Sequence, residues 1–222
     1  MGTPKKKYKN KSTTRKRFVG IGSICALLFL AIGIFMIAQT FNEQQIDRFL
    51  DGGISGYGND EIPEQYYPIY QAAAEAYEIP WEVLPAIHRI ETKFSTMDPM
   101  VSPVGAEGHM QFMPCTWHGW SHHSCDDAGA GEIPNTELKN PDTIEMNGGY
   151  GVDATGSGTA DPWDERDAIF STANFLAANG ADEGDLESAL YMYNRSDMYV
   201  EEVMAYYDIY TNDGYEIVDE NE

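Results

Sequence analysis

Basic side chains are scarce over most of this 222-residue chain. Eight of the 14 lysines and arginines lie within residues 1–17, which contain no acid, so residues 18–222 hold six basic and all 36 acidic side chains. A formal charge of −30 on this part repels phosphate groups, so we expect it to bind neither nucleic acid nor an anionic membrane surface. Internal repeats are also missing, which argues against a solenoid or a propeller and favours one domain.

Alternation of apolar and polar residues is too weak anywhere to predict a sheet. Residues 121–163 are rich in Gly, Asp, Asn and Ser and have no regular period. Helix signals occur elsewhere, such as Asp164 and Ser196 as N-caps and Gly180 as a stop. The sequence therefore predicts an all-α protein with one long ordered loop. The predicted helices cover residues 68–77, 81–93, a short stretch from 114, 164–179, 186–193 and 196–210.

One long apolar run is present, because residues 18–38 contain no charged side chain. At about 1.5 Å per residue, such a helix spans a bilayer core of roughly 30 Å. The basic flank at 1–17 predicts a cytoplasmic N-terminus, and no clear cleavage site follows the run. We expect a single-pass membrane anchor with the rest of the chain outside the cytoplasm. A Gly-rich linker at 39–60, a domain at 61–210 and a loose acidic tail at 211–222 complete the predicted organisation.

A glutamate falls on the apolar side of the helix predicted at 81–93. Leu84, Ile87, Glu91 and Phe94 share one face at helical spacing. Burial disfavours the charged carboxylate and raises its pKa, which suits a general acid that works near neutral pH.

Two features of the same helix bear on this interpretation. Glu91 could instead sit at the edge of the apolar stripe, paired with Arg89, Lys93 or a more distant cation. Pro85 would remove a hydrogen bond from the interior of the helix and bend its axis.

Three short motifs follow in an order that resembles a known family. They are Glu91-Thr92, then Gly-His-Met-Gln at 108–111, then Met-Tyr-Asn at 192–194. They resemble the Glu-Ser, Gly-Leu-Met-Gln and Ala-Tyr-Asn motifs of the soluble-lytic-transglycosylase family, in the goose-type lysozyme superfamily. The resemblance extends over about residues 61–210. It is strongest to membrane-anchored members from Gram-positive bacteria, some of them carried by conjugative elements.

The resemblance implies a lysozyme-like fold and a role for each motif residue. Glu91 would be the only catalytic carboxylate, and Met110 and Gln111 would line the sugar cleft. Tyr193 would hydrogen-bond or orient the glutamate, and Asn194 would support that turn. The chain departs from the family pattern at Thr92, which keeps the hydroxyl of serine, at His109, which could change the cleft or its pH response, and at Met192.

The activity implied is cleavage of the bond between N-acetylmuramic acid and N-acetylglucosamine in peptidoglycan, with formation of a 1,6-anhydromuramoyl end. No cofactor would be required, and the cell-wall opening would serve conjugation or secretion machinery. Two alternatives stay open. Glu107 could activate water as the second carboxylate of a hydrolase (muramidase), or the domain could be a non-catalytic wall-binding scaffold.

Cysteine and histidine are concentrated in one segment, CTWHGWSHHSC. Cys115, His118, His122 and Cys125 could supply four tetrahedral ligands to zinc. Outside the cytoplasm, the two cysteines are more simply interpreted as a disulfide that closes a short loop, a pair that related anchored proteins also have. We predict the disulfide and keep zinc as the alternative.

A second segment resembles a calcium-binding loop, with Gly158 where such a loop needs a sharp turn. Hydroxyls replace two of the usual carboxylates, and the last position is an aspartate with a shorter reach than glutamate. Calcium would therefore bind weakly and have a structural role, and an unoccupied Gly-rich turn is the alternative. The candidate ligands are Asp153, Thr155, Ser157, Thr159, Asp161 and Asp164.

Overall fold

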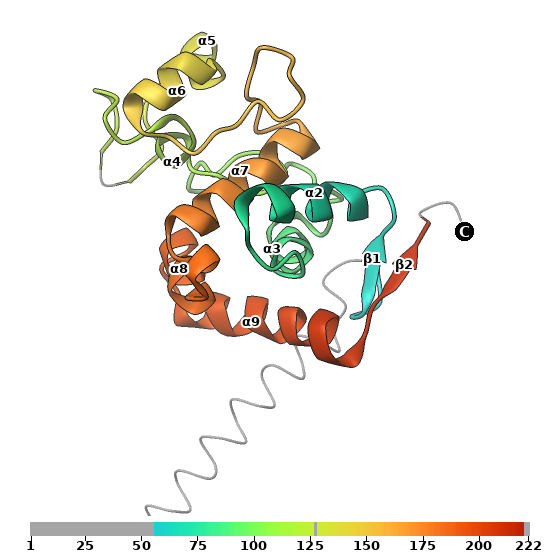
Figure 1. Ribbon diagram of the computed structural model, residues 1–222. Helices are drawn as coiled ribbons and strands as arrows, with labels where there is room; N and C mark the ends of the chain where they lie inside the picture. The colour runs from blue at the N-terminus through green and yellow to red at the C-terminus, as the bar shows by residue number, and fades with distance from the viewer. Residues whose placement is uncertain (1–55, 127, 220–222) are drawn as a thin grey trace, which may run out of the picture. The chain divides into compact units, whose positions relative to one another are not determined.

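The computed structural model describes residues 56–126 and 128–219, and this part of the chain is mostly helical (Figure 1). No helix within it is long and apolar enough to cross a membrane. The segments predicted at 1–17 and 18–38 lie outside the described residues, as does most of the predicted linker. In chain order, the elements are β1 (Glu61–Pro63), α2 (Tyr67–Tyr77), α3 (Val83–Thr92), α4 (Pro114–His118), α5 (Asn135–Leu138), α6 (Pro141–Asn147), α7 (Glu165–Ala178), the 3-10 turn η1 (Ala181–Glu183), α8 (Leu186–Tyr193), α9 (Asp197–Asp208), the π-helical turn η2 (Ile209–Asp213) and β2 (Glu216–Val218).

The predicted caps form where the sequence places them. Asp164 accepts hydrogen bonds from two amides of the first turn of α7, and Ser196 accepts one from Tyr199 at the start of α9. A short polar side chain satisfies amides that have no partner inside the helix. The boundaries of these helices were therefore predictable to within about two residues.

Pro85 removes no hydrogen bond from the interior of α3, contrary to the prediction. The helix begins at Val83 and not at residue 81, so Pro85 is its third residue. The amides of the first turn have no partner inside the helix, so a proline there removes no helical hydrogen bond.

The long loop and the tail contain more structure than predicted. Helices α5 and α6 lie within residues 121–163, and α6 has Asn140 as its N-cap and Gly148 as its C-cap. Strand β2 pairs in parallel with β1, with Glu61 opposite Glu216. The prediction of a loose tail was therefore wrong for residues 216–218. Segments this short carry too few residues to show a period.

Helix α3 lies at the centre of the helical core and contacts α2, α7 and α9 (Figure 1). Its residues Val83, Leu84 and Ile87 are fully buried. Arg89 is also fully buried and donates to the carbonyl oxygens of Gly58 and Glu61, at 2.7 and 2.6 Å. The ordered domain therefore includes residues on the N-terminal side of the predicted boundary at 61.

Candidate active site

Glu91 occupies the last turn of α3 and is half-buried. Burial of its carboxyl group raises its pKa from 4.5 to about 7, and the hydrogen bond from Tyr199 acts in the opposite direction. The hydroxyl of Tyr199 lies 2.7 Å from Glu91 Oε1 and donates to it. At neutral pH, the carboxyl group is therefore present in both protonated and ionised forms, as a group that both gives and accepts a proton needs to be.

Neither proposed cation pairs with this carboxylate. The two ion pairs among the described residues are His122 with Glu137 and Lys139 with Asp161. Arg89 is directed toward β1, and its Nε donates to the hydroxyl of Tyr210. The interpretation of Glu91 as one half of a salt bridge has no support in this part of the chain.

Hydrogen bonds bring the three motifs together. The hydroxyl of Thr92, which is fully buried, donates to the carbonyl of His109 at 2.7 Å. The hydroxyl of Tyr193 donates to the carbonyl of Met110 at 2.6 Å. The ring of Tyr193 also stacks on that of Tyr199, with centroids 6.4 Å apart and planes at 10°. The turn at 108–111 is thus held between α3 on one side and α8 on the other.

The expected roles of the other site residues need correction in part. Tyr193 does not hydrogen-bond to Glu91, because its hydroxyl is directed to Met110 and that of Tyr199 takes the place beside the carboxylate. Met110 cannot line a cleft with its side chain, which is 0% exposed in the core.

Gln111 and Asn194 have different positions around the site. Gln111 is partly buried, and its amide nitrogen donates to the carbonyl oxygens of Met100 and Gly108, so it braces its own turn. Asn194 ends α8 and is exposed. Tyr199 is the site residue that the sequence did not single out. Its place on the buried stripe of α9 is that of an ordinary core residue.

The backbone around these motifs has unusual conformations. Five non-glycine residues among those described have positive φ. Lys93, Phe94 and Ser95 follow directly after Glu91-Thr92, and Gln111 ends the second motif. Such conformations cost about 1–3 kcal/mol each and are concentrated at functional sites. They support the interpretation that the end of α3 and the turn at 108–111 form one site.

His109 belongs to a buried chain of hydrogen bonds. Its Nε2 lies 3.0 Å from the carbonyl oxygen of Trp163, which can only accept, so the ring proton is on Nε2. Ser95 then donates to His109 Nδ1 at 2.6 Å and accepts from His88 Nε2 at 2.7 Å. Burial, followed by the charge of His109, lowers the pKa of His88 to about 3. His109 therefore braces the end of α3 through Ser95.

Two further features bear on the site: the side chain of Glu107 and a cavity beside α8. Glu107 pairs through its main chain with Val101 and Phe112, and no hydrogen bond among the described residues joins its side chain to Glu91. A cavity of about 600 Å³ lies between α8 and the start of α9, and Glu91 is not among its lining residues. This cavity is lined by Glu187, Ser188, Tyr191, Met192, Asp197, Val200 and Glu201.

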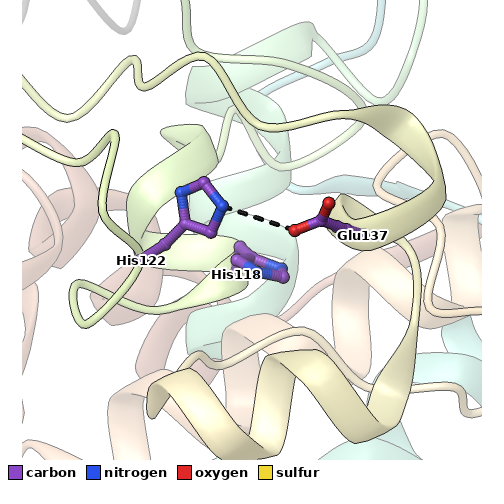
Figure 2. A group of neighbouring side chains, drawn as sticks. All are labelled: His118, His122 and Glu137. Carbon is purple, nitrogen blue, oxygen red and sulfur yellow. Dashed lines mark ion pairs between the residues drawn. The ribbon is translucent and has the colours of Figure 1, made fainter.

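The predicted disulfide between Cys115 and Cys125 is present. Both sulfur atoms are therefore used, and the four-ligand zinc site that included them is wrong. His118 and His122 nevertheless lie together with Glu137, and this is the one group of at least three His, Cys, Asp or Glu side chains in the described chain that could hold a metal (Figure 2).

The aspartates of the calcium-like loop have separate roles. Backbone amides of Ser157 and Gly158 donate to the carboxylate of Asp153. Asp161 pairs with Lys139 at 2.7 Å, and Asp164 caps α7. The loop is held instead by Asp167, which is 1% exposed and accepts from the amides of residues 154, 155 and 161. The remaining candidates, Thr155, Ser157 and Thr159, lie on the exposed part of the loop.

Comparisons of the chain with known protein families, curated proteins and solved structures find no match.

Proposed function

We propose that the protein is a peptidoglycan lytic transglycosylase with a lysozyme-like domain, and that Glu91 is its acid and base. The observation that carries the proposal is the carboxyl group of Glu91, with a pKa of about 7, hydrogen-bonded to Tyr199 and without an ion-pair partner among the described residues. The contacts from Thr92 and Tyr193 to the turn at 108–111 support it, because they join the three motifs of the resemblance.

Most glycosidases use two carboxylates, whereas the resemblance to lytic transglycosylases implies one. In the proposed reaction, protonated Glu91 gives its proton to the glycosidic oxygen, and the bond from that oxygen to C1 of the muramic acid breaks. Ionised Glu91 then takes the proton of the C6 hydroxyl of the same sugar, whose oxygen bonds to C1. The product is a 1,6-anhydro ring, and no water is consumed. The nucleophile belongs to the substrate, so its effective concentration is high, roughly 10⁵ M or more in favourable cases.

The setting of this activity is also a proposal. The resemblance supports a domain held at the outer face of the cell membrane by the segment at 18–38, where it would cut glycan strands locally for conjugation or secretion machinery.

Mass spectrometry of peptidoglycan treated with the purified protein tests the activity. We expect anhydromuramoyl ends with the wild type and with Glu75→Gln, and none with Glu91→Gln. Glu75 is an exposed residue of α2, away from the candidate site. Glu75→Gln is therefore a control that loses the same charge as Glu91→Gln.

Three results would reject the proposal. Reducing ends would identify a hydrolase, with Glu107 as the first residue to test as the second carboxylate. No cleavage by folded wild-type protein would point to a wall-binding scaffold. Equal activity of wild type and Glu91→Gln would remove Glu91 from the mechanism.

A further inference from the structure

Two buried histidines face one exposed glutamate in the region of α4, α5 and α6 (Figure 2). His118 ends α4 and is 0% exposed, and His122 follows it by four residues and is 7% exposed. Glu137 lies on α5, and about half of its side chain is exposed. One ring nitrogen of each histidine and one carboxylate oxygen all lie within 4.8 Å of one another.

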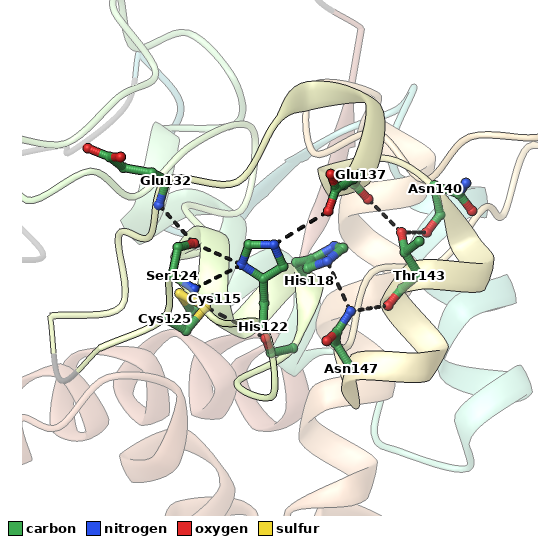
Figure 3. A network of polar contacts seen from close by, with 11 residues as sticks. Cys115, His118, His122, Ser124, Cys125, Glu132, Glu137, Asn140, Thr143 and Asn147 are labelled. Carbon is green, nitrogen blue, oxygen red and sulfur yellow. Dashed lines mark hydrogen bonds and ion pairs between the residues drawn. A yellow bond between two sulfur atoms is a disulfide. The ribbon is translucent and has the colours of Figure 1, made fainter.

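Each histidine has one ring nitrogen in contact with a polar side chain and one without a hydrogen-bond partner (Figure 3). His122 Nδ1 lies 2.8 Å from the hydroxyl of Ser124, and its Nε2 has no hydrogen bond. His118 Nε2 lies 3.2 Å from the amide of Asn147, and its Nδ1 has no hydrogen bond. Buried polar atoms normally have hydrogen-bond partners, and of these two nitrogens His122 Nε2 has a charged group near it, the carboxylate of Glu137. A cation between the two rings and Glu137 would satisfy both nitrogens.

The distance to Glu137 fits a shared metal better than a direct hydrogen bond. His122 Nε2 and Glu137 Oε2 are 3.4 Å apart, yet Nε2 makes no hydrogen bond. With bonds of about 2.0–2.1 Å to zinc, two tetrahedral ligands stand about 3.4 Å from each other. The pair already has the separation of two ligands of one ion.

We propose that His118, His122 and Glu137 bind a zinc ion through two imidazoles and one carboxylate. Two histidines and a glutamate form a recurrent zinc ligand set, whereas calcium and magnesium prefer oxygen alone. Glu137 is on the exposed side, so a water molecule can take the fourth position. This site does not depend on the proposed activity of Glu91.

The surroundings of the histidines are suited to this role. The disulfide joins Cys115 to Cys125, ten positions apart in sequence, and closes the segment that carries both histidines. Gly119, between them, has φ +115°, and a Cβ there would lie 2.3 Å from the carbonyl oxygen of Asn147. This close approach brings α6 against His118. The ion would tie this disulfide-closed loop directly to α5.

Metal binding also fixes where the ring protons are. A neutral imidazole that binds metal through one nitrogen carries its proton on the other. His122 would donate from Nδ1 to the hydroxyl of Ser124, which also accepts from the amide of Glu132. The hydrogen bond that the amide of Ser124 now donates to Nδ1, at 3.3 Å, would then be lost. His118 would donate from Nε2, so Asn147 has to turn its amide oxygen toward the ring and release the carbonyl of Thr143, to which its nitrogen now donates.

Zinc titration of the full-length protein tests the site, with a purification tag free of histidine, after chelator treatment and with the disulfide intact. We expect one zinc per chain by calorimetry, a higher Tm with zinc, and no such effect of calcium or magnesium. Glu137→Gln should weaken zinc binding at least about tenfold, because even the loss of a group that only orients a metal ligand has an effect of this size. Glu132→Gln, an exposed neighbour with the same change of charge, should bind as the wild type does.

Other outcomes would overturn the proposal. Equal zinc affinity of Glu137→Gln and wild type would exclude the glutamate as a ligand. Zinc binding that appears only after reduction of the disulfide would show that Cys115 and Cys125 are ligands. No zinc binding by the folded wild-type protein would show that His122 and Glu137 form an ion pair only. Because Glu137 is exposed, we expect its variant to fold, and circular dichroism checks this.

Discussion

Glu91 owes its raised pKa to burial, and Tyr199 limits the size of that shift. Both tyrosines that stack beside it have a pKa well above 10, because they are buried and then because the charge of Glu91 lies close. They stay protonated, so Tyr199 can donate its hydrogen bond to the carboxylate at any pH near neutral. Near neutral pH, Glu91 is therefore the group that titrates at this site, and Tyr193 and Tyr199 beside it stay neutral.

Tyr199→Phe should move the alkaline side of the pH profile to higher pH. Its hydrogen bond lowers the pKa of Glu91, so its loss raises that pKa further. The first step of the proposed reaction needs protonated Glu91. The value of kcat/KM should therefore fall at a higher pH in this variant than the pH of about 7 expected for the wild type. We also expect kcat to drop by about tenfold, because the carboxyl group is no longer held in place.

Tyr207→Phe, on the same helix but partly exposed, is the matched control, and its profile should be that of the wild type. A Tyr199→Phe profile that coincides with the wild type, or that shifts to lower pH, would contradict the role of this hydrogen bond.

At the scale of elements, the turn at 108–111 decides whether the three motifs meet. Its position depends on Gly108, which has φ +76° and lies against Pro162. The amide of His109 bonds to the carbonyl oxygen of the same proline at 3.2 Å. The chain therefore passes close to the loop before α7 at a point where there is no room for a side chain.

Gly108→Ala should destabilise the protein by at least about 3 kcal/mol. A Cβ would lie 1.9 Å from the carbonyl oxygen of Pro162, in addition to the cost of positive φ. Gly156→Ala is the control, because Gly156 has a similar φ of +71° and open space around it, so it should cost only about 1 kcal/mol. Thermal unfolding of both variants measures the difference, and equal losses would show that the contact with Pro162 is unimportant.

At the scale of the whole domain, its two ends in sequence are joined. Strands β1 and β2 pair in parallel, and the amide of Glu216 donates to the carbonyl of Asp60 at 2.9 Å. Arg89 connects this sheet to the core, since its guanidinium donates hydrogen bonds to the carbonyl oxygen of Glu61 and to the hydroxyl of Tyr210. Residues 57–63 and 216–218 thus form part of the support of α3.

Truncation after Asp213 should lower the stability of the domain by about 2 kcal/mol, because it removes the hydrogen bonds that β2 makes with β1. For a chain of this size, the Tm should fall by about 4–8 °C. Truncation after Asp219, which keeps β2, should leave the Tm unchanged. A differential scanning measurement that gives the same Tm for both would mean that β2 contributes nothing to the fold.

The sequence alone determined the larger helices and the candidate acid. Caps such as Asp164 and Ser196 act through neighbouring amides, and the apolar spacing around Glu91 is a local property of one helix, so both could be predicted. The cysteine pair was predictable because two cysteines close in sequence, in a segment expected outside the cytoplasm, are most simply interpreted as a disulfide.

Only the tertiary structure decided which groups meet. Tyr199 is 108 residues from Glu91, Tyr193 is 83 from Met110, and β2 is far from β1 in the chain. Contacts of this kind depend on how helices pack and leave no period or spacing in the sequence. The same holds for the third member of the proposed zinc site. The sequence suggested Cys115 and Cys125 beside the two histidines, and the structure places Glu137 there instead. Glu137 lies on a helix of four residues, which is too short to have a pattern that predicts its position.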